Sequence, residues 1–259
     1  MRINIDKLFL SLDNPTFIID EEILLDLSAE KKDNHLEKAD IEFAMSYFSG
    51  NFKSFSLEGA AKNLFEISTN AFDNIMLAWL SELPIEREII AYGRGILAAA
   101  QDFNSFDDKH RAAEKAANNR TNSDTLTVLN TANKVQFEVH RMMGLLRFNK
   151  NEGGEFIAMC EPDHLILPCL GNFFTARFGD TPWAIIDEKR GIVLSKKPGE
   201  QAKINISKEA AKGFSAAKSD EWEDLWKHYH KTINNEDRNN PYLQRQLMPK
   251  RYWKHLPEV

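Results

Sequence analysis

Two histidines lie where a side chain could exchange a proton. His140 falls near the end of a long helical pattern, and His164 follows Asp163 where a strand pattern gives way to a helical one. An imidazole has an ordinary pKa of about 6.5, so it can serve as an acid, a base or a phosphate contact near neutral pH. With the carboxyl groups of Asp163 and Asp187, the two histidines are candidate acid/base groups for a hydrolase or lyase.

Each of these residues also has a structural interpretation. A histidine at a helix end can bind terminal carbonyls and favours the helix dipole, which accounts for His140 without any reaction. Asp163 can be the N-cap of the helix that follows it. His164 would then lie in the first turn, where free backbone N–H groups favour an anion. The sequence leaves the catalytic and structural alternatives open.

The C-terminal segment combines cations with aromatic rings. Residues 238–255 contain five Lys and Arg residues and no acid. Cations that contact phosphates, together with flat rings on which bases stack, are typical of proteins that bind single-stranded or flipped-out nucleic acid. The alternative is that the apolar and aromatic residues of the segment anchor it to the core while the cations stay in solvent; they are Tyr242, Leu247, Met248, Tyr252 and Trp253. We expect the segment to be packed, because its apolar residues are too dense for a solvated tail; they are Leu243, Leu247, Tyr252, Trp253 and Leu256. The candidate nucleic-acid contacts in the chain are Arg141, Arg147, Arg177, Arg190, Arg245, Lys250 and Arg251.

Several common catalytic and cofactor signatures are missing from the sequence. It contains no phosphate-binding glycine loop and no G-x-S-x-G nucleophile turn. Cys160 and Cys169 are too few for an iron–sulfur cluster, and we expect both to be structural, as small apolar side chains. His228 and His230 are two apart on a helical pattern, so they point to different faces and make a poor metal pair. We predict no metal site and no cofactor.

Charge and composition limit the classes of partner. The 259-residue chain has a net charge of −6, with a net of −8 over residues 1–120 and +2 over residues 121–259. That balance argues against a protein that coats nucleic acid through bulk charge. The acidic half could instead be the contact surface of a protein–protein adaptor. No apolar run reaches the roughly 18 residues that span a bilayer. With no signal-peptide pattern at the N-terminus and only two cysteines, we expect a cytoplasmic protein without membrane contact.

Helical periodicity dominates the first half of the chain. Apolar residues recur three or four positions apart between Leu36 and Ala100, and Pro84 divides this stretch. Residues 102–122 are polar, and we predict a surface connector with a short helical stretch. A long helix is predicted to begin with Ser123 or Asp124 as its N-cap and to end near Gly144. Its predicted apolar face consists of Leu126, Leu129, Asn133, Gln136, Val139 and Met143.

The second half changes to short strand patterns. The predicted strands are 145–148, 155–160, 183–187, 192–196 and 202–206, with turns at 153–154 and 188–191. An apolar helix is predicted over 165–178 and another over 222–233. This order favours an α+β fold with a helical N-terminal half and, in the C-terminal half, a small antiparallel sheet with helices packed on one side.

Four segments resemble a known bacterial family. They are VQFEVHRMMGLLRF (135–148), FIAMCEPDHLILPCL (156–170), FFTARFGDTPWAIIDEKRG (173–191) and NPYLQRQLMPKRYWKHLPE (240–258), with WLSE (79–82) further upstream. In this order they resemble the domain of unknown function 4130 family, whose members are described as DNA metabolism or DNA repair proteins. Residues 1–50 do not match the start of that family and stay unassigned. We therefore expect a single α+β domain over 51–259.

The resemblance implies a role beside another enzyme. Such proteins are similar to those found with a radical-SAM enzyme of the photoproduct-lyase kind, or fused to a uracil-DNA-glycosylase-like domain. This chain lacks the cysteine triplet of the first and any motif of the second. The resemblance thus implies an accessory protein of DNA repair, with a radical-SAM repair enzyme or single-stranded or damaged DNA as its partner. No catalytic residue can be carried over. A DNA-acting hydrolase or lyase that uses His140 and His164, and an adaptor, are the alternatives.

Overall fold

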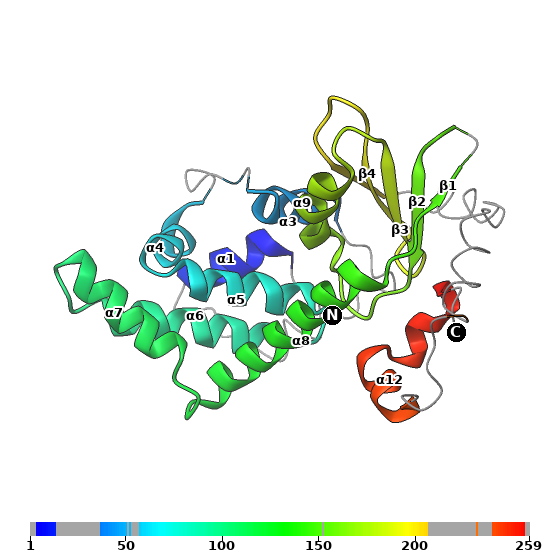
Figure 1. Ribbon diagram of the computed structural model, residues 1–259. Helices are drawn as coiled ribbons and strands as arrows, with labels where there is room; N and C mark the ends of the chain where they lie inside the picture. Colours follow the sequence, from blue (N-terminus) through cyan, green and yellow to red (C-terminus); the bar gives the residue numbers. More distant parts are fainter. Residues whose placement is uncertain are drawn as a thin grey trace, which may run out of the picture. The chain divides into compact units, whose positions relative to one another are not determined.

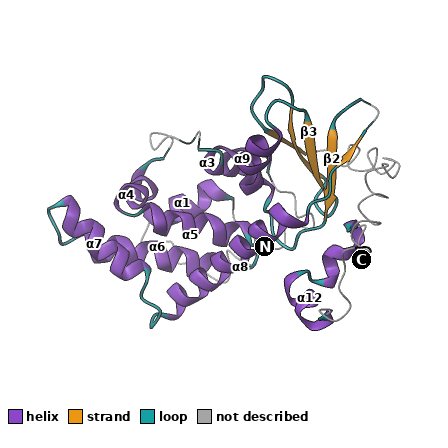
Figure 2. Ribbon diagram, in the orientation of Figure 1, coloured by secondary structure: helices purple, strands orange, loops and turns teal. Residues whose placement is uncertain are grey.

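The computed structural model divides into two compact units, residues 1–137 and 138–259. The structure describes residues 4–13, 37–50, 52, 57–151, 153–206, 232 and 240–256. Every strand among the described residues belongs to the second unit (Figure 2). The α+β class predicted from the sequence is confirmed. The predicted boundary near residue 50 stays a prediction.

The first unit is built from helices (Figure 1). They are α1 (Ile5–Asp13), α3 (Lys38–Phe48), α4 (Gly59–Ile67), α5 (Thr69–Leu80), α6 (Glu86–Ala100), α7 (Phe106–Ala117) and the first part of α8 (Ser123–Leu145). Polar contacts fix α1 at both ends. The Asp40 carboxylate accepts a hydrogen bond from the Ile5 backbone N–H at 2.8 Å, and Arg94 donates to the Ser11 carbonyl.

Apolar residues that recur three or four positions apart in the first half are buried, with one break between them. Leu64, Ile67, Ala71, Ile75 and Ala78 are all buried. They lie on two helices, because the chain turns at Ser68, whose hydroxyl accepts the Ala71 N–H at 3.0 Å and caps α5.

Residues 102–122 contain more helix than predicted. The twelve-residue α7 begins at a Ser105 cap, and its Ala113 and Ala117 are fully buried. Alanine has a high helix propensity and a small side chain, so this polar segment can still pack closely.

Helix α8 differs from its prediction in cap and in buried face. Asn122, one residue before the predicted caps, accepts the Thr125 N–H at 2.9 Å. Leu126 is 38% exposed, and Asn133 and Gln136 are exposed. Leu129 and Val139 are buried as predicted, and the other buried positions are Thr125, Val128, Thr131, Ala132, Val135, Glu138 and Met142. The helix is therefore rotated relative to the predicted face, and this rotation buries a carboxylate.

The second unit contains a five-stranded sheet in the order β1-β2-β3-β4-β5 (Figure 1). The strands are β1 (Asn149–Lys150), β2 (Phe156–Cys160), β3 (Trp183–Asp187), β4 (Ile192–Lys196) and β5 (Lys203–Ile206). Helix α9 (Leu167–Phe178) connects β2 to β3 and covers one face, where Phe174 contacts the buried Trp183 ring. Ile157, Ile186 and Val193 form a buried cluster in the same sheet.

The predicted all-antiparallel sheet is wrong at one pairing. Strands β2 and β3 are parallel, with Phe156 opposite Trp183 and Cys160 opposite Asp187, while the other three pairings are antiparallel. The reason is that a helical crossover returns the chain to the same edge of the sheet, so the next strand runs in the same direction. The strand predicted at 145–148 is also wrong, because α8 continues to Leu145 and β1 begins at Asn149.

The C-terminal segment forms α12 (Pro241–Leu247) and a 3₁₀ helix, η3 (Lys250–His255). Tyr252 and Leu256 are buried, as expected for a packed segment. Leu243 and Leu247 of α12 are exposed, contrary to that expectation. The helix predicted over 222–233 lies outside the described residues apart from Thr232. Among the residues that the structure describes, no helix is long and apolar enough to cross a membrane.

Two glycines provide a matched test of the first unit. Gly59 has φ +55°, and a Cβ atom there would lie 2.3 Å from the Asp13 carboxylate, which accepts the Ala60 N–H. Gly95, inside α6, has nothing within 4 Å of its Cβ position. We expect Gly59→Ala to lower the free energy of unfolding by about 2 kcal/mol and Gly95→Ala to raise it by about 0.5–1 kcal/mol. Urea denaturation measures both. Equal effects of the two substitutions would contradict the role given to Gly59.

Candidate functional site

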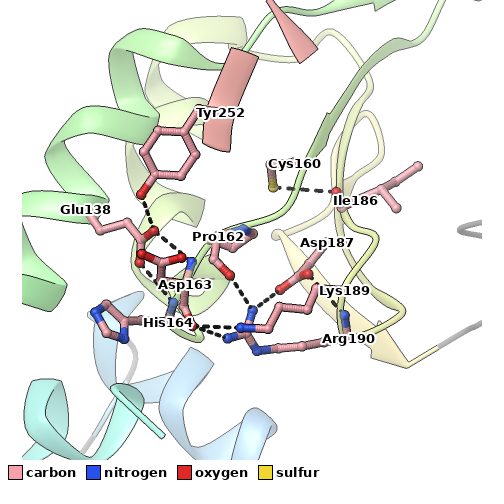
Figure 3. A network of polar contacts seen from close by, with 10 residues as sticks. All are labelled: Glu138, Cys160, Pro162, Asp163, His164, Ile186, Asp187, Lys189, Arg190 and Tyr252. Atoms are coloured by element: carbon pink, nitrogen blue, oxygen red, sulfur yellow. Dashed lines mark hydrogen bonds and ion pairs between the residues drawn. The ribbon is translucent and has the colours of Figure 1, made fainter. Parts of the chain in front are cut away.

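A buried carboxylate lies at the centre of the polar contacts in the second unit. Glu138, on α8, is only 2% exposed. Its Oε1 accepts the Asp163 backbone N–H at 2.8 Å, and its Oε2 accepts the His164 backbone N–H at 2.9 Å (Figure 3). A buried carboxylate is costly unless charge-assisted hydrogen bonds satisfy it, and backbone N–H donors do so here.

Tyr252 connects this carboxylate to the C-terminal segment. Its hydroxyl donates to Glu138 Oε1 at 2.5 Å and accepts from Arg251 Nη2 at 3.0 Å. Arg251 also lies 2.9 Å from the Asp163 carboxylate. Burial is the main cause that raises the pKa of Tyr252 well above its ordinary value, and the hydrogen bond to Glu138 is the second. The phenol therefore stays protonated and remains a donor at neutral pH.

A buried ion pair provides hydrogen-bond donors for the backbone carbonyls of the loop that contains Asp163 and His164. Asp187, at the end of β3, is fully buried, and its Oδ2 lies 2.7 Å from Arg190 Nη1. The same guanidinium donates to the Pro162 and Asp163 carbonyls at 3.1 and 2.8 Å. Lys189 donates to the Asp163 carbonyl as well, at 3.0 Å. Figure 3 shows these donors converging on the loop from the side opposite Glu138.

A second cluster lies where β2 and β3 end. Glu161 and Glu188 directly follow the two strands, and the Lys254 ammonium of η3 contacts both, at 2.9 Å in the case of Glu188. His255 Nε2 lies 3.4 Å from Glu188 Oε2. The hydrogen bond from Lys254 lowers the pKa of Glu161, and burial lowers the pKa of His255. The Glu161 carboxylate is thus charged and the imidazole neutral at neutral pH.

A small cavity adjoins this cluster. Its lining includes Cys160, Glu161, Tyr252 and His255, together with apolar side chains of α8, and it has room for about one water molecule. A cavity of this size does not hold a nucleotide or a small-molecule substrate.

The structure brings together three of the four predicted acid/base residues. Asp163, His164 and Asp187 belong to one network, whereas His140 is exposed on α8 and outside it. The His164 ring points away from the Asp187–Arg190 pair (Figure 3). Asp163 is not the predicted cap of the following helix: α9 starts after Ile166 without a side-chain cap. Glu138 instead accepts the backbone N–H groups of Asp163 and His164 themselves.

The predicted nucleic-acid contacts fall into two groups. Arg190 and Arg251 bind carboxylates of the chain, and Arg147 donates to the Gly144 carbonyl at the end of α8. Lys250 is exposed and lies 5.7 Å from the Trp253 ring. The remaining arginines lie in separate elements: Arg141 on α8, Arg177 in the last turn of α9 and Arg245 in the last turn of α12.

Glu138 and the Glu161–Glu188–His255 cluster were missed by the sequence reading. Glu138 could have been found, because it lies three positions after Val135 and four before Met142, on the buried face of α8. A carboxylate at such a position must have partners. No local pattern could have found the cluster, since its members come from three distant segments.

Comparison with known proteins adds the family. Residues 103–258 match the family described as a domain of unknown function, DUF4130. The chain belongs to this family. The matched region includes every residue of the Glu138 network and of the carboxylate cluster. No curated protein and no solved structure matches the chain.

Removal of the Glu138 carboxylate should destabilise the second unit of this DUF4130 protein. In Glu138→Ala the two loop N–H groups and the Tyr252 hydroxyl lose their acceptor, so we expect the free energy of unfolding to fall by about 3 kcal/mol. Tyr252→Phe removes only one donor and should cost about 1 kcal/mol. Urea denaturation followed by circular dichroism measures both changes.

A double-mutant cycle tests the link between the two residues. The double variant should be about as unstable as Glu138→Ala alone, because both substitutions remove the same hydrogen bond. Glu200→Ala, in an exposed ion pair with Lys203, is the control and should leave the unfolding midpoint unchanged. Simple additivity of the two single effects would mean that Tyr252 and Glu138 stabilise the unit independently.

Proposed function

We propose that this protein is an accessory component of DNA metabolism or repair that binds single-stranded DNA beside a repair enzyme, without a catalytic site of its own. The resemblance of its four segments to DNA repair proteins supports the proposal. One observation supports the DNA contact most directly. In the short segment formed by α12 and the start of η3, the Tyr242 ring and the Lys250 ammonium are both exposed.

The ion pairs of the acid/base candidates Asp163 and Asp187 favour a binding role over a catalytic one. Asp187 is fully buried and holds Arg190 with both carboxylate oxygens. The Asp163 carboxylate is paired with Arg251. A general base must lie within hydrogen-bond reach of a substrate proton, and these two carboxylates are instead engaged with cations of the chain itself. His140 stands apart from them, so a hydrolase with His140 and His164 acting together has less support.

The proposed DNA contact uses the Tyr242 ring and the Lys250 ammonium. Tyr242 is 79% exposed, which is unusual for a large ring without a ligand to cover it. Any of the four bases can stack on such a ring, and the Lys250 ammonium, eight residues further along the chain, can contact the backbone of the same DNA strand. Arg245 lies between them in the chain, on α12.

Anisotropy with a labelled oligonucleotide tests this contact. Tyr242→Ala should weaken binding about 5- to 150-fold, because one stacking contact contributes roughly 1–3 kcal/mol. Lys250→Ala should reduce the slope of log affinity against log salt by about 0.7, the effect of one phosphate contact on a single strand. Arg251 is unsuitable as a test residue, since its loss would also disturb Asp163 and Tyr252.

A matched control and the contrary outcome complete the experiment. Lys203→Ala removes another exposed lysine, from β5, and should leave both affinity and salt slope unchanged. If folded wild-type protein fails to bind at low salt, the DNA contact is wrong, and an adaptor that docks through residues 1–120 becomes the better hypothesis. Cleavage of the oligonucleotide during the assay would instead support the hydrolase or lyase alternative.

The accessory role has its own test. A radical-SAM repair enzyme should be retained on the immobilised protein, and the retention should increase when damaged DNA is present, because both proteins would contact the same strand. Retention that is equal with and without DNA, and unaffected by Tyr242→Ala, would separate partner binding from DNA binding.

A further inference from the structure

The ends of β2 and β3 form a shared edge at which side chains converge. The two strands are adjacent and parallel, so their carboxyl ends lie together, and ligand sites in sheets of this kind are found outside such ends. Glu161 follows β2 directly, and Glu188 follows β3. Both carboxylates are partly buried, and they meet the η3 segment here.

A third ligand group reaches this edge from η3. The His255 Nε2 atom, a Glu161 oxygen and a Glu188 oxygen all lie within 4.8 Å of one another. His255 Nε2 is buried from solvent, and no hydrogen bond satisfies it among the described residues. A buried ring nitrogen without a partner is uncommon, and here it lies beside two carboxylates and a water-sized cavity.

The cluster already binds a cation. The Lys254 ammonium contacts both carboxylates, so two negative charges at this edge are compensated by one positive charge. The Lys254 side chain is nevertheless 58% exposed, and its long stem lets the ammonium move into solvent. An ion of higher charge that also bound the imidazole would compete with it.

We propose that Glu161, Glu188 and His255 bind one first-row divalent transition-metal ion, such as Zn²⁺, in place of the Lys254 ammonium. Two carboxylate oxygens and one imidazole nitrogen suit such an ion, whereas Mg²⁺ and Ca²⁺ favour oxygen ligands alone. The adjoining cavity leaves room for about one water molecule as a further ligand. The ion fastens η3 to the ends of β2 and β3, and its binding is independent of the proposed DNA contact.

Calorimetric titration of the full-length protein with Zn²⁺ tests the site. One ion should bind, and the melting temperature should rise with Zn²⁺ concentration, because the three ligands are assembled only in the folded chain. Lys254→Ala removes the competing ammonium and its repulsion of the ion. We expect this variant to bind Zn²⁺ at least about tenfold more tightly.

The remaining variants locate the ion. Glu188→Gln and His255→Ala, each checked for folding by circular dichroism, should lose the tight binding and the rise in melting temperature. The double variant His228→Ala/His230→Ala removes two histidines that are close in sequence. Glu200→Gln removes an exposed carboxylate of the second unit. Both controls should bind like the wild type.

Three outcomes would overturn the proposal. The first is an absence of binding to both the wild type and Lys254→Ala. The second is binding that survives Glu188→Gln, which decides the matter even if His255→Ala does not fold. The third is binding lost only in His228→Ala/His230→Ala, which would place the ion elsewhere.

Discussion

The second unit depends on the burial of one carboxylate. Glu138 projects from the buried face of α8, where a charge without partners would cost several kcal/mol. Two backbone N–H groups and the Tyr252 hydroxyl meet that requirement. Because these donors come from a loop and from the C-terminal segment, a single side chain fixes two parts of the chain that are far apart in sequence.

The loop that Glu138 holds is secured from its other side by a cation. The Arg190 guanidinium donates to the Pro162 and Asp163 carbonyls, and the buried Asp187 carboxylate holds that guanidinium in place. Backbone N–H groups thus meet a carboxylate, while carbonyls of the same short loop meet a guanidinium. A loop without regular secondary structure can pass between a helix and a strand end only if its polar backbone groups are satisfied in this way. The parallel pairing of β2 and β3 makes this possible, since it places the end of β3 beside the loop that leaves β2.

Local patterns predicted the elements well and their contacts poorly. Helix α6, helix α9, strands β2 to β5 and the turn at 188–191 follow from periodicity and turn residues, which are properties of neighbouring positions. The antiparallel direction of one strand pair and the cap interpretation of Asp163 were wrong, because both depend on which distant group meets a segment. On α8, the predicted face took Asn133 and Gln136 as inward positions and left out Val135 and Glu138. A polar residue on a helix is ambiguous to a periodicity argument until its partner is known.

The same reasoning explains the basic C-terminal segment. Residues 238–255 contain five cations and no acid, and the sequence by itself therefore suggests a basic surface that binds nucleic acid. In the folded chain Arg251 and Lys254 are matched by Asp163, Glu161 and Glu188, all more than 60 positions away. An acid-free stretch of sequence is therefore not the same as a basic surface. Arg251 and Lys254 fasten η3, whereas Tyr242 of α12 and Lys250 at the start of η3 remain exposed. The difference follows from position: Lys254 reaches the carboxylates at the ends of β2 and β3, whereas the side chains of Tyr242, Leu243 and Leu247 on α12 are exposed to solvent.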